Sequence, residues 1–321
     1  MTQYSNDVEA ADALKQKHDQ LIAEIGKVVF GQKEIIEQVL TVMFSGGHCL
    51  LVGVPGLAKT LLVNTIAKAL DLKYKRIQFT PDLMPSDITG SEILDEQKNF
   101  RFIKGPVFAN IILADEINRT PPKTQSALLE AMQEHTVTVS GNNYVLDEPF
   151  FVLATQNPVE QEGTYPLPEA QLDRFMFNVI LDYPSVDEEI TIVKNTTRDT
   201  SVQTAKVVSA EEIIYFRNLI KKVAVSDNVV KYAVTLAAKT RPHTPTAHEA
   251  ANKYLNWGAG PRASQYLVSG AKTYAMLHGK YSPDIDDVKA VALPVLRHRI
   301  IRNYQAEAEG LSEDDLIKMM L

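Results

Sequence analysis

The chain has 321 residues, of which 45% are hydrophobic and 23% are charged, so its composition is that of a folded globular protein of about two domains and excludes a disordered chain. The formal net charge of −7 gives it no general attraction to nucleic acid or to anionic membranes, and a protein is the more plausible partner. A single cysteine excludes a disulfide framework, and because neither a secretory signal nor an apolar run of transmembrane length is present, we expect a cytoplasmic protein without a membrane segment.

Two helices are predicted first. Residues 7–27 carry Leu14, Leu21, Ile22 and Ile25 among many charged positions, which is typical of a helix that docks on a larger domain through one thin apolar stripe. The pattern breaks at Val28 to Gln32, and residues 33–44 then repeat apolar residues at helical spacing until Gly46-Gly47 ends the helix.

The next stretch is a Gly-rich turn between a short apolar run, residues 49–52, and a helical pattern at residues 61–70. The turn reads Gly53-Val54-Pro55-Gly56-Leu57-Ala58-Lys59-Thr60. This order is typical of a phosphate-binding loop, in which backbone N–H groups and the helix N-terminus bind phosphate, Lys59 reaches the β- and γ-oxygens, and Thr60 offers a hydroxyl to Mg²⁺. A chance turn before a core helix is the alternative.

One position of this loop departs from the usual pattern, since Ala58 stands where a second glycine is expected. A methyl group is tolerated there if the backbone is already helical, and we expect a helical backbone because Ala58 stands just before Lys59 at the helix start. The candidate nucleotide-binding residues of the loop are Gly53, Pro55, Gly56, Leu57, Ala58, Lys59, Thr60 and Leu61.

Strands and helices then alternate. We predict strands at residues 74–79, 111–114 and 150–155, a helix from Pro121 through Met132, and a hairpin over residues 136–146. Apolar strands that alternate with helices indicate an α/β fold, with a parallel sheet covered on both faces and a ligand site at the carboxyl ends of its strands.

Beyond residue 187 the pattern is helical. The predicted helices cover residues 209–223, 227–239, 263–278 and 285–292, after one possible strand at 177–181. The polar stretch at residues 195–206 is the best candidate boundary. We therefore predict a domain at residues 1–195, which includes the N-terminal helix, the α/β core and an insertion at about 80–105, and a smaller helical domain at residues 206–321.

Polar side chains follow two of the predicted strands. Downstream of a phosphate-binding loop, Asp115 is expected to hold Mg²⁺ together with Thr60, while Glu116 polarises the attacking water. Asn157 can hydrogen-bond both that water and the γ-phosphate. The alternatives are a solvated helix start for the acidic pair and a turn before Pro158 for Asn157.

The histidines offer no further site. His243, His248 and His298 lack the spacing and the nearby carboxylates or cysteines of a metal centre, so structural roles are favoured. Nucleotide-bound Mg²⁺ is the only metal that we expect.

Several motifs in order resemble the MoxR family of AAA+ ATPases, from about residue 30 to residue 300. The segments that carry this resemblance are residues 53–60, Gly105-Pro106-Val107-Phe108, Asp115-Glu116-Ile117-Asn118-Arg119, Pro122-Lys123-Thr124-Gln125, Leu128-Leu129-Glu130-Ala131-Met132, Ala154-Thr155-Gln156-Asn157-Pro158 and Leu172-Asp173-Arg174-Phe175. The resemblance implies an AAA+ core with a five-stranded parallel sheet, a helix-two insert at residues 80–105, a pre-sensor hairpin at 136–146 and an all-helical lid. It also implies that Ala58 is the usual form.

The resemblance assigns roles to three further side chains. Asn157 is the implied sensor one, Arg174 the implied arginine finger directed at the ATP of a neighbouring subunit, and Arg262 the implied sensor two. For both arginines an ordinary salt bridge is the alternative. Arg119 either contacts a neighbour's phosphate or braces the subunit interface.

Two other segments are placed by the resemblance. Residues 28–32 match the segment that lies along the adenine, so Val29, Phe30 and Gly31 are candidate base contacts, with core packing as the alternative. Gly260 replaces a residue that is more often Ser in relatives, and we expect it to loosen the turn before Arg262.

The activity implied by the resemblance is Mg²⁺-dependent hydrolysis of ATP by a homo-hexameric ring. Such a ring remodels or activates a protein client or a metalloenzyme complex in a chaperone-like way, often with a von Willebrand factor A domain partner. A nucleotide-gated binding module with incidental hydrolysis and a metal-chelatase-like motor subunit are the alternatives. Intact Glu116, Asn157 and Arg174 favour hydrolysis, and the motifs at residues 115–119 and 122–125 fit MoxR better than a chelatase.

Overall fold

The computed structural model describes residues 4–94, 96, 98–159, 163–197 and 203–321. Part of the predicted boundary at 195–206 and two positions of the predicted insert therefore lie outside the described residues. The helices are α1 (Asp7–Gly26), α2 (Lys33–Ser45), α3 (Lys59–Ala69), α4 (Pro85–Thr89), α5 (Pro122–Glu134), α6 (Glu169–Leu172), α7 (Val186–Thr196), α8 (Ala210–Lys222), α9 (Asp227–Lys239), α10 (Glu249–Tyr254), α11 (Pro261–Leu277), α12 (Ile285–Leu296), α13 (Tyr304–Ala308) and α14 (Glu313–Met320), with a 3₁₀ turn at Ile117–Arg119. The strands are β1 (Cys49–Gly53), β2 (Tyr74–Gln78), β3 (Gly90–Leu94), β4 (Phe100–Lys104), β5 (Ile111–Asp115), β6 (Thr136–Val139), β7 (Asn142–Val145), β8 (Phe151–Gln156), β9 (Phe177–Leu181), β10 (Leu255–Trp257) and β11 (Ile301–Arg302).

The centre of the molecule is a five-stranded sheet in the order β2-β5-β8-β1-β9, and every neighbouring pair is parallel. Its strands are short apolar runs because both faces are covered by helices. The sheet confirms the predicted α/β fold with a five-stranded parallel core. All five carboxyl ends lie at one edge of the sheet, which for β1, β5 and β8 is the edge where the predicted polar motifs begin.

The sheet separates two hydrophobic cores. Along β1, Cys49 and Leu51 point into the core that is shared with α1, α2 and α3, whereas Leu50 points into the core beneath α5. This alternation is the side-chain period of a strand. Burial also raises the pKa of the Cys49 thiol, which agrees with the packing role expected for the single cysteine.

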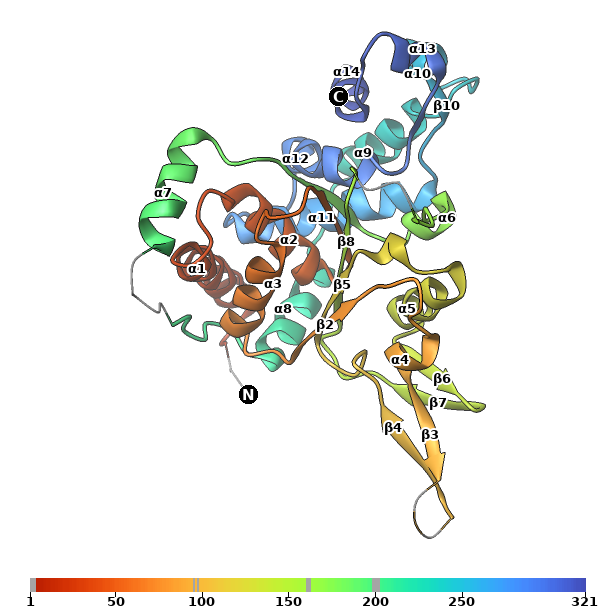
Figure 1. Ribbon diagram of the computed structural model, residues 1–321. Coiled ribbons are helices and arrows are strands. Elements are labelled where there is room, and N and C mark those ends of the chain that lie inside the picture. Colours follow the sequence, from red (N-terminus) through yellow and green to blue (C-terminus); the bar gives the residue numbers. More distant parts are fainter. Residues whose placement is uncertain (1–3, 95, 97, 160–162, 198–202) are drawn as a thin grey trace.

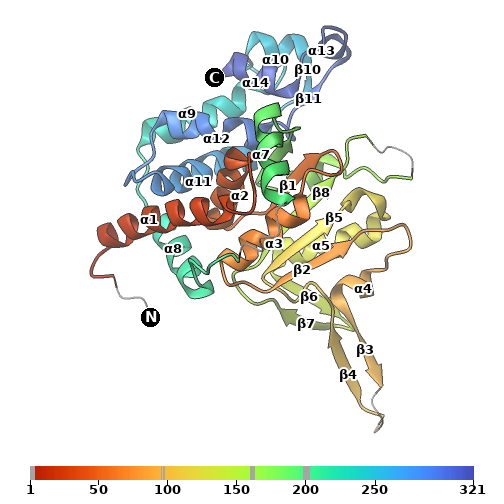
Figure 2. The same cartoon turned by 60° about the vertical axis from the view of Figure 1, so that its left-hand side comes forward.

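The C-terminal helical region, residues 203–321, is built around α11, which contacts α12, α9 and α8 and also α1 and α2 (Figure 2). The four helices predicted here are present as α8, α9, α11 and α12. A short antiparallel ribbon, β10 with β11, and the helices α10, α13 and α14 were not predicted, because each is too short for periodicity to show. No helix among the described residues is long and apolar enough to cross a membrane.

Two hairpins stand at one end of the molecule. The β3–β4 hairpin projects from the body (Figure 1) and exposes Ile93, Leu94 and Phe100. The β6–β7 hairpin matches the hairpin predicted at 136–146. The two are joined by stacking of Phe102 on Tyr144, whose ring centroids lie 4.0 Å apart.

Candidate functional site: the two ends of the parallel sheet

A cavity of about 440 Å³ opens beside the predicted phosphate-binding loop. The predicted residues that line it are Val28, Val29, Phe30, Gln32, Pro55, Gly56, Leu57, Ala58 and Leu61. The segment before α2 is tied to the loop by a hydrogen bond from Gln32 Nε2 to the Leu57 carbonyl oxygen at 3.2 Å. The two segments, distant in sequence, therefore form one wall that combines apolar surface with backbone polar groups.

The opposite wall of this cavity was not predicted from the sequence. It comes from the segment after β9 and from α7, through Tyr183, Pro184, Glu189, Ile192 and Thr196. The signal was present, because Ser185 starts a capping box with Glu188 ahead of apolar residues at helical spacing. The helices predicted from the sequence begin only at residue 209, so α7 was not among them.

Two glycines predicted to bind nucleotide pack closely against other parts of the chain. A β-carbon on Gly31, whose φ is +74°, would lie 3.0 Å from the Glu188 carboxylate, and one on Gly53 would lie 2.8 Å from Leu181. Neither residue lines the 440 Å³ cavity. Both positions need glycine because neighbouring chain segments approach closely.

The conformation of Ala58 differs from the expected one. Ala58 has φ 55° and ψ 26°, the left-handed region, and the first helical residue is Lys59. The expectation of a helical backbone was wrong, because the loop must reverse direction at the cap before α3 begins. A non-glycine residue in this region costs roughly 1–2 kcal/mol.

Lys59 and Thr60 open α3. The Lys59 side chain is half-buried, and its ammonium donates a hydrogen bond to the Gly53 carbonyl oxygen. Burial lowers the pKa of Lys59, while the nearby carboxylates of Asp115 and Glu116 act in the opposite direction. Thr60 is exposed at the helix start. The structure thus brings the predicted loop cation and the predicted acidic pair together.

The acidic pair is held by hydrogen bonds from neighbouring strands. Thr155 Oγ1 on β8 donates to Asp115 Oδ1 at 2.6 Å and accepts from the Glu116 backbone N–H at 2.8 Å. Arg76 on β2 donates to Asp115 Oδ2 through Nε at 3.0 Å and Nη2 at 2.6 Å. Arg76 was not predicted from the sequence, because its place beside Asp115 depends on the order of the strands in the sheet.

The carboxylate of Glu116 also has polar partners within the chain. Gln78 Nε2 donates to Glu116 Oε2 at 3.0 Å, and Arg119 Nη1 donates to the same oxygen at 3.1 Å. Arg119, left open between two roles, therefore contacts the acidic pair of its own chain. Glu116 itself is left-handed, with φ 57°.

Asn157 directly follows β8, at the same edge of the sheet as the acidic pair, and is 7% exposed. Its Oδ1 accepts a hydrogen bond from the Val159 backbone N–H at 3.1 Å, which is the contact of a turn residue. Its position at the carboxyl end of β8, next to the end of β5, is the one predicted.

Arg174 and Arg262 lie at the opposite end of the sheet. Both line a second hollow, of about 240 Å³, together with Gly46, Gly47 and His48, which precede β1. Arg174 Nη1 donates to the Leu129 carbonyl oxygen at 2.9 Å, and Arg262 Nη1 to Asp173 Oδ2 at 3.3 Å. The phosphate-binding loop follows the other end of β1, and five residues of strand span about 16 Å. The structure therefore groups Arg262 with Arg174 and away from its own loop.

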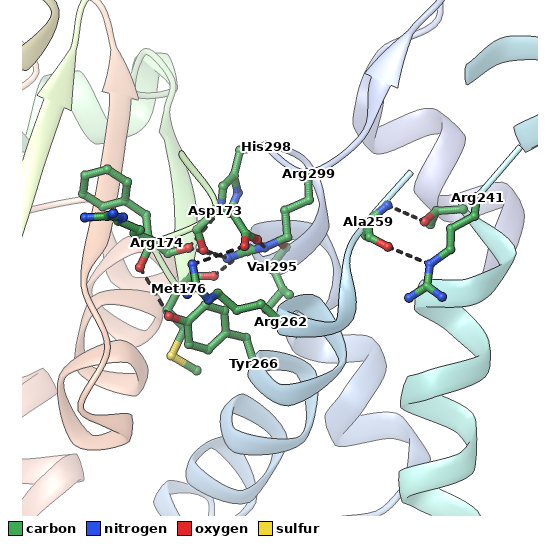
Figure 3. A network of polar contacts seen from close by, with 12 residues as sticks. Asp173, Arg174, Met176, Arg241, Ala259, Arg262, Tyr266, Val295, His298 and Arg299 are labelled. Atoms are coloured by element: carbon green, nitrogen blue, oxygen red, sulfur yellow. Dashed lines mark hydrogen bonds and ion pairs between the residues drawn. The ribbon is translucent and has the colours of Figure 1, made fainter. Parts of the chain in front are cut away.

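The turn before Arg262 is held on both sides (Figure 3). The Ala259 backbone N–H donates to Thr240 Oγ1 at 2.9 Å, and Arg241 Nε donates to the Ala259 carbonyl oxygen at 2.8 Å. Gly260 is extended, with φ −77° and ψ 178°. These contacts counter the loosening that we expected from Gly260.

His48, which sequence analysis also missed, is buried at the same end of the sheet. Its Nδ1 accepts from the Val152 backbone N–H at 3.1 Å, so its Nε2 carries the proton and donates to the Met132 carbonyl oxygen at 2.9 Å. Burial lowers the pKa of His48 to about 4. His48 is therefore a neutral ring that ties β8 to α5.

The residues present fit a magnesium nucleotide. Mg²⁺ bound to a nucleotide takes one or two carboxylates plus phosphate oxygens, and Asp115 with the Thr60 hydroxyl can supply the protein part. Among the described residues no group of three His, Cys, Asp or Glu could hold a metal ion by itself. His298 Nε2 donates a hydrogen bond to the Phe175 carbonyl oxygen, 3.0 Å away, which is a structural contact as expected.

Comparisons with known proteins agree with this geometry. Residues 48–177 match the "ATPase family associated with various cellular activities (AAA)", and residues 247–319 match the "AAA lid domain". The chain is 41% identical to the uncharacterized protein YeaC of Bacillus subtilis over 94% of this chain and 92% of the relative. It is 40% identical to Chaperone MoxR1 of Mycobacterium tuberculosis over 94% and 80%, and 30% identical to Protein MoxR of Paracoccus denitrificans over 90% of each. A crystal structure of a provisionally assigned ATPase from Cytophaga hutchinsonii is similar, with a TM-score of 0.90 and 48% identity over 97% of this chain and 95% of the other.

Proposed function

This chain belongs to the MoxR family of AAA+ ATPases, and from that membership we propose that it binds and hydrolyses ATP in a ring of subunits. The observation that carries the proposal is the half-buried Lys59 ammonium opposite Asp115 and Glu116, beside a cavity whose wall is the loop itself. A cation for phosphate, a metal-binding carboxylate and a carboxylate base are the parts that ATP hydrolysis needs.

Each part has a distinct task in the proposed reaction. Lys59 binds the β- and γ-phosphate oxygens, and Thr60 and Asp115 hold Mg²⁺, which when bound neutralises phosphate charge. Glu116 accepts a proton from the attacking water, and Asn157 orients that water. Gln78 and Arg119, which both donate hydrogen bonds to Glu116 Oε2, hold its carboxylate in place.

Completion of the site requires a second subunit in this proposal. Arg174 and Arg262 lie at the end of β1 that is opposite to their own loop, so they are available to the γ-phosphate of a neighbour. A ring, which we propose to be a hexamer of this chain, brings the arginine end of one subunit to the nucleotide end of the next. Both arginines then act in trans.

A protein client is the proposed target of the ring. The β3–β4 hairpin offers Phe100, which is 75% exposed, and Leu94, which is 60% exposed, on a projecting arm. One relative is named a chaperone. A metalloenzyme client, a von Willebrand factor A domain partner and a cytoplasmic location stay predictions from the resemblance.

The proposal is tested by mixing two variants that fail for different reasons. Glu116→Gln keeps Arg174 but loses the base, for an expected loss of about 10²–10⁴ in turnover. Arg174→Ala keeps a complete loop but cannot serve a neighbour, and an arginine finger is worth roughly 10³–10⁵. In mixed rings some Arg174→Ala sites face an intact finger, so ATPase activity should exceed the sum of the two variants and peak at intermediate ratios.

Two observations keep this test interpretable. A tag pull-down must show that the mixed rings form, and both variants must bind ATP as the unchanged protein does. Mixed rings with no activity above the sum would mean that Arg174 does not act in trans. Activity that stays near zero even in the unchanged protein, with ATP-dependent assembly retained, would instead favour the nucleotide-gated binding module.

A further inference from the structure

The side chain of Arg299, just after α12, is 1% exposed and uses all five of its N–H donors. Nε donates to Asp173 Oδ1 at 2.8 Å, and Nη2 donates to the carbonyl oxygens of Asp173 at 2.9 Å and Phe175 at 2.6 Å. Nη1 donates to the Met176 carbonyl oxygen at 3.2 Å and to that of Val295. Four of these five bonds cross from the C-terminal helical region to the segment before β9.

That segment, residues 173–176, contains Arg174 and is held along its whole length (Figure 3). Tyr266 on α11 donates its hydroxyl to the Arg174 carbonyl oxygen at 3.3 Å, and its ring lies against the Arg299 guanidinium at 5.0 Å. Each of the four carbonyl groups of the segment therefore accepts a hydrogen bond from a side chain of the C-terminal helical region.

The Asp173 carboxylate connects Arg262 to the buried Arg299. Its Oδ1 accepts from Arg299 and its Oδ2 accepts from Arg262 Nη1 at 3.3 Å. The Arg262 side chain is 38% exposed, in contrast to the buried Arg299. Arg299 thus fixes the carboxylate that orients Arg262 and the backbone from which Arg174 extends.

We propose that Arg299 is a positioning residue for Arg174 and Arg262. It fixes these two side chains relative to each other and to the C-terminal helical region. The inference rests on the proposed action of Arg174 in trans. Among the described residues, the hydrogen bonds of Arg299 go to residues 173–176 and Val295 and not to residues 53–60, so its loss should impair a subunit as a donor of Arg174 while its own nucleotide site stays complete. A lysine cannot replace it, because one ammonium cannot reach acceptors spread over four residues.

The test uses Arg299→Lys in the mixing assay. Alone, the variant should be on the order of 10- to 100-fold slower, the effect of a displaced catalytic group. Mixed with Glu116→Gln, whose Arg174 is intact, it should regain activity. Mixed with Arg174→Ala it should give none above the sum, because neither subunit donates a well-placed finger.

The opposite pattern would overturn the inference. If Arg299→Lys rescues Arg174→Ala but is not rescued by Glu116→Gln, Arg299 supports its own nucleotide site. Unchanged activity of Arg299→Lys alone would also overturn it. A reference mixture of Arg174→Ala with Glu116→Gln that shows no rescue removes the proposed function and this inference together, whereas rescue there with a wrong pattern for Arg299 removes only the inference.

Two more variants separate positioning from stability. Arg297→Lys is the matched control, since Arg297 bonds Asp314 and the Asn178 carbonyl oxygen but not residues 173–176, and it should keep its activity. Asp173→Asn is the substitute variant if Arg299→Lys does not fold. Asparagine has the same size as aspartate, but without the charge its hydrogen bonds to Arg262 and Arg299 are weaker. It should show the same donor-only defect, with ATP affinity unchanged, and a defect on the acceptor side would contradict the inference.

Discussion

The two ends of the parallel sheet hold their charges in different ways. At the carboxyl end, Asp115 and Glu116 are paired with Arg76 and Arg119, whose side chains are 47% and 41% exposed. At the amino end, Arg299 is buried and bonded to backbone carbonyl groups. Exposed ion pairs contribute little to stability and exchange readily, whereas a buried and fully bonded arginine is costly to move. The ion pairs at the carboxyl end of the sheet can therefore be exchanged for other partners, whereas the hydrogen bonds of Arg299 hold the amino end in one conformation.

The largest expected effect is a loss of ATP binding at the carboxyl end of the sheet. Lys59→Ala should weaken ATP binding at least about 100-fold, because a charge-assisted contact to the phosphates has no substitute nearby. Titration with a fluorescent ATP analogue measures it. Lys68→Ala, at the exposed last turn of the same helix, is the control and should bind normally. Affinity within a factor of two of the unchanged protein would refute the phosphate-binding loop.

Acid should lower the free energy of unfolding through His48, at the amino end of the sheet. Burial, as the main cause, lowers its pKa from 6.5 to about 4; the neighbouring His135 and Arg217 lower it further, and the Met132 carbonyl and Glu148 oppose this. As the pH falls, His48 is therefore protonated in the unfolded chain before it is protonated in the folded one. The contribution of the neutral His48 ring to the free energy of unfolding is fully present above pH 6.5 and is lost as the pH falls toward 4. Each pKa unit is worth about 1.4 kcal/mol, so His48 should remove about 2 kcal/mol between pH 7 and pH 5.

Urea unfolding at both pH values measures this loss, and His48→Gln should shrink it by about that amount. His243→Asn is the control, because His243 is exposed and left-handed and asparagine tolerates that backbone. If the pH dependence of His48→Gln equals that of the unchanged protein, the neutral ring of His48 is not what acid disrupts.

The smallest expected effect concerns the backbone of Ala58 at the carboxyl end of the sheet. Ala58→Gly should raise the free energy of unfolding by about 1 kcal/mol, since glycine adopts the left-handed backbone without strain but loses more freedom on folding. Ala67→Gly, in the interior of the same helix, should lower it by about 1 kcal/mol or more. Thermal unfolding of both variants gives the comparison, and destabilisation by Ala58→Gly would show that its backbone is not strained.

The sequence was informative where local chemistry and order along the chain decide the outcome. The loop at residues 53–60 and the pair Asp115-Glu116 are contiguous motifs, so they could be predicted, as could strands with unbroken apolar runs. Arg76 and His48 could not, because each acquires meaning from a neighbouring strand that is distant in sequence. Ala58 was misjudged because a template of residue types does not specify which backbone position must turn back.

The stack of Phe102 on Tyr144 has a mechanical consequence. It couples the projecting β3–β4 arm to β7, whose partner strand β6 follows directly from α5, and α5 supplies the Leu129 carbonyl that accepts from Arg174. The described contacts therefore form one continuous path from β3 and β4 through two hairpins and one helix to the contact of that arginine.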